Sequence, residues 1–243
     1  GQVAPDGQIA SVQADTAAMA ADQCVGALMP APVNLHSHAF QRAMAGMTER
    51  RGPHGRDTFW TWRQLMFRFL EALTPDDIQA ISTFVQMEML EAGHAAVAEF
   101  HYVHHQADGT PYADIGELSA RVAAAADVSG IGLTLLPVLY QQAGCMGASL
   151  APGQVRFGND VDRFAALHTR ATAIMAALPA DAGIGVAPHS LRAVNRDGLA
   201  AAVGLAAGQP LHMHLAEQVD EVDEVLGAYG QRPVDWLLEF FFF

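Results

Sequence analysis

Cysteine is scarce in this sequence, and long apolar runs are missing. Of the 243 residues only Cys24 and Cys145 are cysteines, and no CxxC or framework spacing connects them. We therefore interpret both as free thiols, which argues against a disulfide-held scaffold. No stretch approaches the roughly 18 apolar residues of a membrane-spanning helix, and residues 1–23 contain no basic segment typical of a secretion signal. These absences predict no membrane span and a cytoplasmic location.

Basic residues are also few. Thirteen Lys and Arg stand against 26 Asp and Glu, giving a formal net charge of −13, and no basic cluster offers the stripe that a phosphate backbone needs. Nucleic acid is therefore not expected as a partner. With 51% hydrophobic and 16% charged residues, the composition is globular and sufficient for one large domain or two small ones.

Beyond a low-periodicity start, the chain alternates two kinds of pattern. Residues 1–29 are rich in Ala, Asp, Gln and Gly and predict at most a few short strands. Apolar runs typical of strands follow at 31–38, 94–105, 130–140, 183–191 and 209–217. Helical patterns lie at 57–73, about 113–128, 160–178 and 195–207, and a further helix opens at Thr74 as N-cap with Pro75 at its first position and stops at Gly93.

This alternation is typical of βα units on a parallel sheet, and two architectures fit it. Successive strand starts lie about 44 residues apart, so an eight-unit (β/α) barrel would need roughly 350 residues. The chain has 243. It is therefore either a five-stranded doubly wound sheet or the first five units of a (β/α)8 barrel, an α/β fold in both cases.

Two pairs of histidines mark the first and the fifth strand-like runs. Side chains alternate along a strand, so His36 and His38 share one face, and so do His212 and His214. Strands one and five of an eight-stranded barrel face each other across the axis, so such pairs can meet at a single Zn²⁺ at the carboxyl ends of the strands. The alternative is chance, because the chain has 11 histidines and a single histidine is more often a core or surface residue.

Glu217 follows His214 by three residues, just beyond the expected strand end. A carboxylate there could move a proton between water and a substrate at the metal. An acid at a helix N-terminus is the equally good alternative for this position.

Five stretches together make a resemblance that none makes alone: NLHSHAFQRAMAGMTE at the first run, FWTWRQLM in the following helix, EFHYVHH at the second run, APHSLRAV at the fourth and HMHLAEQ at the fifth. The sequence from about residue 30 to 238 resembles the amidohydrolase superfamily, and within it the formimidoylglutamate deiminases. The resemblance implies a metal-dependent (β/α)8 barrel with a small β-sandwich domain built from both chain termini. Residues 30–243 would then be a partial barrel of about five units, and residues 1–29 a remnant of the β-sandwich.

Carried over by position, the resemblance implies a site as well. His36, His38 and His214 would bind one Zn²⁺, Glu217 would be the catalytic proton carrier, and the substrate would contact Gln41, Arg63, Tyr102, His189 and Arg192. The substrate would be N-formimino-L-glutamate, hydrolysed to N-formyl-L-glutamate and ammonia. Its two carboxylates suit guanidinium groups, of which this chain has few. Without the resemblance, each of these contacts would be a surface cation, a solvated amide or an ordinary packed ring.

The remaining histidines are assigned no metal. His212 shares the inward face of His214 but lies deeper, as core or as support for the ligands. The cluster of His101, His104 and His105 is expected at the surface or as support, because two adjacent residues of a regular strand cannot face one ion.

The resemblance also exposes what this chain lacks. The family uses a histidine on strand six and an aspartate on strand eight, and no motif here replaces them. The ending DWLLEFFFF has no cap and no polar exit, so we expect either that a C-terminal part is missing or that the tail is artefactual. Two rival functions stay open: an amidohydrolase acting on another amidine or a nucleobase, and a metal-binding chain without turnover. The oligomeric state is open too, with a homodimer among the options.

Overall fold

The chain divides into two compact units in the computed structural model, which describes residues 1–4, 7–15, 23–48 and 59–240. The first unit is Gly1–Pro30 and the second is Ala31–Phe243. In the first unit, strands β1 (Gln2–Val3) and β2 (Ile9–Ser11) pair antiparallel. All five residues of this pair are exposed, so it has little core of its own.

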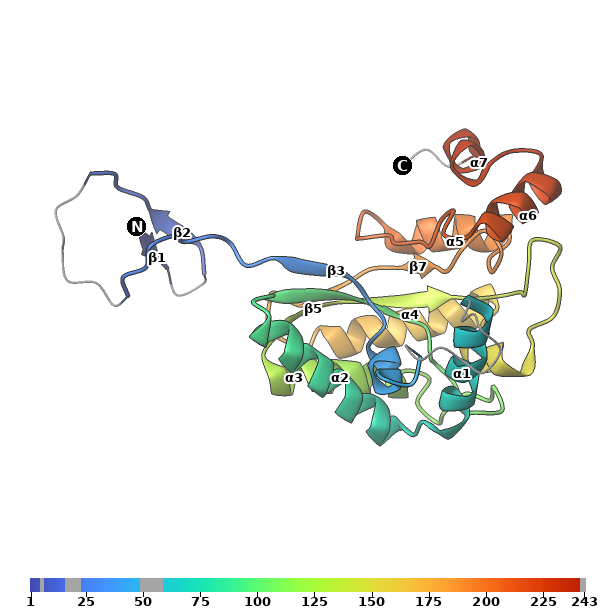
Figure 1. Cartoon of the computed structure of the whole chain (residues 1–243), viewed down its shortest axis with the longest axis horizontal. Helices are drawn as coiled ribbons and strands as arrows, with labels where there is room; N and C mark the ends of the chain where they lie inside the picture. Colours follow the sequence, from blue (N-terminus) through green and yellow to red (C-terminus); the bar gives the residue numbers. More distant parts are fainter. Residues whose placement is uncertain (5–6, 16–22, 49–58, 241–243) are drawn as a thin grey trace. The chain divides into compact units, whose positions relative to one another are not determined.

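A parallel sheet organises the second unit (Figure 1). Its strands are β3 (Val33–Ser37), β4 (Ala96–His101), β5 (Gly132–Leu139), β6 (Gly183–Ile184) and β7 (Ala187–Pro188). The strands lie in sequence order, with β6 and β7 both pairing with β5. A doubly wound sheet would reverse its order at a switch point, whereas a barrel adds each strand beside the previous one. The strand order therefore identifies this sheet as the first part of a barrel.

The expected strand at 209–217 is the main correction. That segment forms only one β-bridge, between Leu211 and Val186. Pro210 has no amide hydrogen to give to a ladder, and its carbonyl lies where a Cβ on Gly185 would be, so the two segments approach more closely than side chains allow. Three backbone hydrogen bonds still hold the segment beside the fourth unit, the last from the amide of His214 to the carbonyl of His189 at 2.9 Å. His214 thus keeps its place although the strand is lost.

Helices connect the strands, and the five that lie before residue 207 are those that the patterns predicted. They are α1 (Phe59–Ala72), α2 (Pro75–Glu91), α3 (Glu117–Ser129), α4 (Val161–Met175), α5 (Arg196–Ala206), α6 (Val219–Tyr229) and α7 (Pro233–Phe240), with short 3₁₀ segments η1 (Ala39–Met44) and η2 (Pro152–Phe157). Thr74 caps α2 as expected, in a capping box with Asp77, and Gly93 follows its end with a φ of +91° that suits glycine. No helix in the described ranges has both the length and the apolar character to cross a membrane.

The core lies between the sheet and the row of helices α2, α3 and α4, which pack against one another in sequence order. Strand β5 is buried on both faces, since Leu133 and Leu135 on one face and Leu136 and Val138 on the other are at most 1% exposed. This is the environment of a central parallel strand, and it explains the continuous apolar run that the sequence shows there. Because the strands are parallel, their carboxyl ends share one edge, and the residues following them meet there.

Candidate metal centre and substrate pocket

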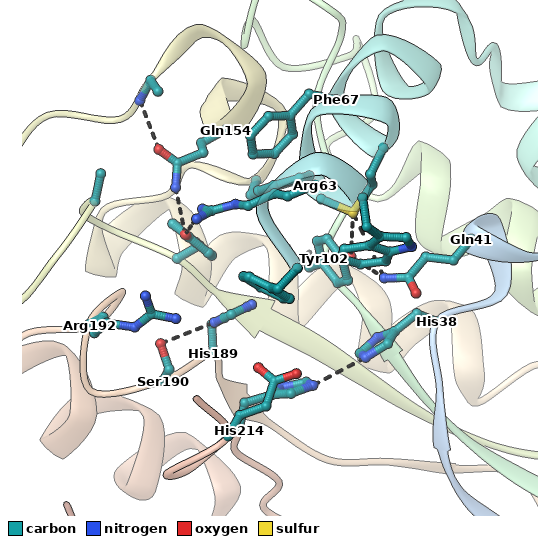
Figure 2. Close-up of a pocket in the computed structure, with 18 of the residues that line it drawn as sticks. His38, Gln41, Arg63, Phe67, Tyr102, Gln154, His189, Ser190, Arg192 and His214 are labelled. Carbon is teal, nitrogen blue, oxygen red and sulfur yellow. Dashed lines mark hydrogen bonds between the residues drawn. The ribbon is translucent and has the colours of Figure 1, made fainter. Parts of the chain in front are cut away.

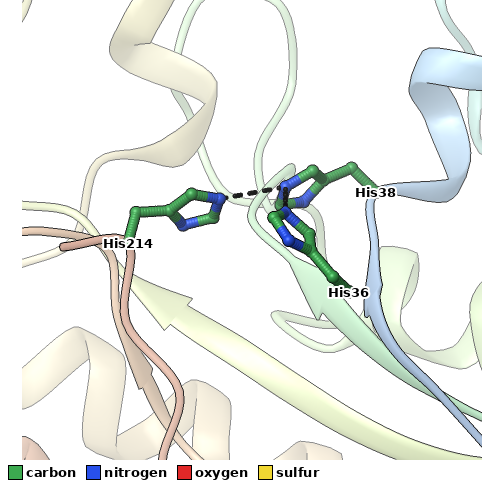
Figure 3. A group of neighbouring side chains, drawn as sticks. All are labelled: His36, His38 and His214. Atoms are coloured by element: carbon green, nitrogen blue, oxygen red, sulfur yellow. Dashed lines mark hydrogen bonds between the residues drawn. The ribbon is translucent and has the colours of Figure 1, made fainter. Parts of the chain in front are cut away.

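Three imidazoles converge at this edge (Figure 3). The Nε2 atom of His38 lies 3.1 Å from that of His36 and 3.2 Å from that of His214. Among the described residues, these three form the group of His, Cys, Asp or Glu side chains able to share an ion, with ligand atoms all within 4.8 Å. Nitrogens that each bind a tetrahedral Zn²⁺ at about 2.0–2.1 Å stand roughly 3.3 Å apart, so the spacing fits a metal centre.

The protonation of the cluster also suits a metal. The Nδ1 atom of His38 lies 3.2 Å from the carbonyl oxygen of Phe100, which can only accept, so Nδ1 carries the hydrogen and the lone pair of Nε2 faces the other rings. Burial and the neighbouring His214 lower the pKa of His38 to about 3. Burial and His36 lower the pKa of His214 to about 4. These two rings are therefore neutral at neutral pH, as metal ligands must be.

A buried carboxyl holds the segment that carries two of the three ligands. The pairing of β3 with β4 slips by one residue between Asn34 and Ser37, which bulges the backbone around His36. The Glu99 carboxyl closes this irregular stretch, because it accepts a hydrogen bond from the amide of Ala39 at 2.7 Å and bonds the side chain of Ser37. Burial raises the pKa of Glu99 to about 7, while the two hydrogen bonds oppose that rise.

A cavity of about 770 Å³ opens beside the three histidines (Figure 2). All nine residues that the resemblance assigns to the site line this one cavity: His36, His38, Gln41, Arg63, Tyr102, His189, Arg192, His214 and Glu217. They come from β3, from the segments after β3, β4 and β7, from α1 and from the loop before α6. The structure therefore brings together residues that are scattered over more than 180 positions; their roles in binding and catalysis stay predictions.

Aromatic and polar side chains form the wall next to the histidines. The amide of Gln41 donates to the hydroxyl of Tyr102 at 2.7 Å. Burial raises the pKa of that hydroxyl above its usual range, so it stays protonated. The ring of His189 stacks on that of His214 with a centroid distance of 5.2 Å, and its Nδ1 lies 3.2 Å from the hydroxyl of Ser190. Burial and His214 hold the pKa of His189 well below its usual value, so this wall is neutral.

Positive charge enters the cavity from two guanidinium groups. Arg63 on α1 lies over the ring of Phe67, 5.2 Å from its centroid. Arg192 follows the fourth unit and is half-buried, and its Nε is a buried donor without a hydrogen-bond partner among the described residues. No carboxylate in the described ranges forms an ion pair with Arg192. A buried donor that carries a charge and lacks an acceptor indicates an anionic ligand.

Glu217 lies exposed at the cavity mouth, on a loop held by a second carboxylate. Glu221 is 1% exposed at the third position of α6, and it accepts the amides of Ala216 at 3.1 Å and of Glu217 at 3.0 Å. Ala216 has a φ of +55°, a conformation that alanine rarely adopts. The carboxylate of Glu221 thus holds the turn that directs Glu217.

Several further lining residues were not anticipated from the sequence, among them Tyr140 and Gln154. Tyr140 directly follows β5, and Gln154 belongs to η2. A usable signal existed for Tyr140, because it is the residue after the third strand-like run and such positions line the mouth of a barrel. Gln154 has no such signal, since only the fold of the 141–160 connection places it here.

The other histidines are buried. His101, His104 and His105 are at most 5% exposed, so a surface position for them is wrong, and their support of the site stays a prediction. The Nε2 of His104 bonds the carbonyl of Val138, and that of His105 bonds the side chain of Asn159. His212 is half-buried and lies outside the group of three.

The sequence is similar to those of known proteins. Residues 27–243 match the sequence profile of the Amidohydrolase family. The chain is 47% identical over 241 residues, 98% of its length, to the formimidoylglutamate deiminase of Pseudomonas aeruginosa, of which it covers 52%. It therefore spans about half the length of this relative.

Solved structures agree on the fold. An amidohydrolase from Brucella melitensis, 48% identical, superimposes with a TM-score of 0.83 over 86% of this chain and 46% of the other. A zinc-bound adenosine deaminase from Xanthomonas campestris, 21% identical, superimposes with a TM-score of 0.65 over 87% of this chain and 42% of the other. The expected partial (β/α) barrel is thereby confirmed.

Proposed function

This chain belongs to the amidohydrolase family, and from that premise we propose that it carries the metal site and substrate pocket of a zinc-dependent deiminase acting on N-formimino-L-glutamate. One Zn²⁺ would be held by His36, His38 and His214. The finding that carries the proposal is that a single cavity is lined both by this imidazole cluster and by two arginines. The relative named for this activity, 47% identical, supports the same substrate.

The two kinds of lining match the two ends of this substrate. Its formimino group is an uncharged or cationic amidine at one end, and two carboxylates form the other. Arg63 and Arg192 would bind the carboxylates, since guanidinium groups pair with them through two hydrogen bonds. Gln41, Tyr102 and His189 would contact the substrate between the arginines and the metal site, with neutral groups that add no competing charge.

Hydrolysis adds the oxygen of one water to the formimino carbon, breaks the bond to the terminal nitrogen and releases ammonia. A zinc ion supplies Lewis acidity that makes water reactive at neutral pH. The protons of that water must reach the departing nitrogen. We assign this transfer to the carboxylate of Glu217, which lines the cavity and is held by Glu221.

The decisive experiment compares substrates on the zinc-loaded chain, alone and joined to the part of the Pseudomonas aeruginosa deiminase that it does not cover. Because no motif of this chain replaces the strand-six histidine and strand-eight aspartate of the family, we expect the joined protein to release ammonia from N-formimino-L-glutamate, to lose this release with a chelator and to recover it with added Zn²⁺. A simple amidine without carboxylates and adenosine serve as alternative substrates. Hydrolysis of either as fast as N-formimino-L-glutamate would reject the proposed substrate and favour the rival assignments.

Binding separates substrate recognition from turnover. Isothermal titration with N-formyl-L-glutamate, the stable product, is expected to show binding that Arg192→Met weakens by about 10-fold or more, since hydrogen bonds to charged groups contribute about 1.5–3 kcal/mol. Arg196→Met is the matched control, because Arg196 at the start of α5 is exposed and lies against Phe240 instead of the cavity. Binding without ammonia release would reject catalysis by this chain and identify it as a ligand-binding and metal-binding protein. Absence of binding would reject the substrate class.

A further inference from the structure

The third βα unit places a tyrosine in the cavity that the proposed function has not used. Tyr140 follows the last residue of β5, is 6% exposed, and packs its ring edge against His189 with centroids 4.7 Å apart. It lines the same cavity as the histidine cluster and the arginines. Its hydroxyl is therefore buried next to the space where the substrate would lie.

The hydrogen-bond direction at this hydroxyl is determined by Gln154. The amide of Ala151 donates to Oε1 of Gln154 at 2.9 Å, and a backbone N–H can only donate. That contact fixes the side-chain amide, so its Nε2 is the atom 2.7 Å from the Tyr140 oxygen. Gln154 is 3% exposed, so little solvent competes for these hydrogen bonds. The Tyr140 oxygen consequently accepts from Gln154.

A second donor reaches the same oxygen. Nη2 of Arg63 lies 3.5 Å from it, and Figure 2 shows the ends of Gln154 and Arg63 directed to one place. Both Gln154 and Arg63 therefore donate to the hydroxyl oxygen. A phenol has one hydrogen of its own, and no acceptor for that hydrogen is found among the described residues. A buried hydroxyl hydrogen without an acceptor is costly, so the cavity must supply one.

We propose that Tyr140 is a further substrate-binding residue, whose hydroxyl, oriented by Gln154, donates a hydrogen bond to a carboxylate of the ligand. The inference rests on the proposed function, because the positive charge of Arg63 beside the hydroxyl is what selects an anionic acceptor. Tyr140 would then distinguish dicarboxylates from ligands in which that carboxylate is replaced by a neutral amide, since a hydrogen bond to a charged acceptor contributes more than one to a neutral acceptor.

The test measures dissociation constants by isothermal titration on the zinc-loaded chain. The probes are N-formyl-L-glutamate and its two monoamides, N-formyl-L-glutamine and N-formyl-L-isoglutamine, each of which replaces one carboxylate. Tyr140→Phe is expected to weaken the binding of N-formyl-L-glutamate by about 10-fold, as for loss of one hydrogen bond to a charged group. The monoamide that already lacks the carboxylate bound by Tyr140 should lose much less affinity through the same substitution.

Gln154→Glu gives an independent test without removing the tyrosine. A carboxylate at this position would still accept the Ala151 amide but would also accept the hydroxyl hydrogen of Tyr140, withdrawing it from the ligand. We expect this variant to weaken the binding of N-formyl-L-glutamate at least as much as Tyr140→Phe does. Tyr112→Phe is the matched control, because its hydroxyl contacts Arg156 and lies outside the cavity lining. Thermal unfolding of each variant reports whether the fold is kept.

The outcomes separate the two proposals. Unchanged affinity of Tyr140→Phe for N-formyl-L-glutamate, or an equal loss for all three probes, would overturn the role of Tyr140. If Arg192→Met still weakens the binding of N-formyl-L-glutamate, the proposed function stands even though the role of Tyr140 is overturned. If the unaltered chain binds none of the probes, the proposed function itself is rejected.

Discussion

The Nε2 atoms of His38 and His214 lie 3.2 Å apart, although the two residues are 176 positions apart in the chain. Nothing local brings them together. His38 follows β3, and its ring bonds the carbonyl of Phe100. The backbone amide of His214 donates a hydrogen bond to the carbonyl of His189. Each hydrogen bond runs to the neighbouring segment of the sheet. The metal site is therefore a product of strand order, and disturbing either attachment disturbs the site.

Loss of an imidazole from the cluster should abolish tight zinc binding. We expect the unaltered chain to take up one Zn²⁺, and His38→Ala or His214→Ala to weaken it by more than about 100-fold, since even indirect support of a ligand accounts for 10–100-fold. Competition with a chromophoric chelator measures the affinity. His168→Ala is the matched control, because His168 lies on α4, outside both the group of three and the cavity lining. Tight zinc binding by His214→Ala would show that the ion is held elsewhere.

Removing the carboxylate of Glu221 should loosen the turn that carries Glu217. Glutamine at this position has one oxygen for two amides, so Glu221→Gln should destabilise the fold by about 1–2 kcal/mol. Hydrogen exchange of the Ala216 and Glu217 amides should become faster, because these are the hydrogens that Glu221 accepts. Asp223→Asn removes the same charge from an exposed position of α6 and should leave both amides protected. Equal protection in both variants would contradict the assigned contact.

The raised pKa of Glu99 predicts that the chain becomes less stable as pH rises. Its folded pKa, about 7, lies above the unfolded value of 4.5, so the folded state binds the extra proton between these values. The stabilisation is complete below about pH 4.5 and is lost as pH rises through 7. Glu99→Gln keeps an acceptor for the Ala39 amide and cannot ionise.

This variant should therefore be the more stable chain above pH 7, by up to about 3 kcal/mol. Urea unfolding of both chains from pH 5 to 8.5, with chelator present, measures the difference. The difference should grow with pH through the folded pKa of Glu99. A difference that stays constant over this range would show that Glu99 keeps an ordinary pKa.

Arg156 should be essential for the packing of η2 against α1. It is 3% exposed, and it donates to the carbonyl of His105 at 2.8 Å, to that of Leu73 at 3.0 Å and to that of Leu70. Arg156→Met leaves these buried acceptors without a donor, which should cost about 3 kcal/mol or more. Chemical unfolding measures the effect, with Arg163→Met on the exposed face of α4 as control. An equally small effect in both variants would contradict this role.

Helices and βα alternation were predictable because they depend on local patterns. The Thr74 cap, the Gly93 stop and the apolar run of β5 all appear where the sequence places them. The fifth strand was mispredicted, because an alternating pattern cannot reveal that Pro210 and Gly185 come too close for a regular ladder.

The buried cluster of His101, His104 and His105 shows the same limit. Its position depends on partners more than 30 residues away, including the carbonyl of Val138 and the side chain of Asn159. No local pattern reports such contacts.

The sequence by itself determined the chemical parts: two HxH pairs, an acid after the second, few cations, and enough apolar residues in the right periods to make βα units. It left open whether those units form a doubly wound sheet or a barrel. Only the tertiary structure decided that, because strand order arises from contacts between distant segments. The same contacts aim Gln154 at Tyr140 and Glu221 at the turn before Glu217, since hydrogen-bond direction depends on atoms that become neighbours only in the folded chain.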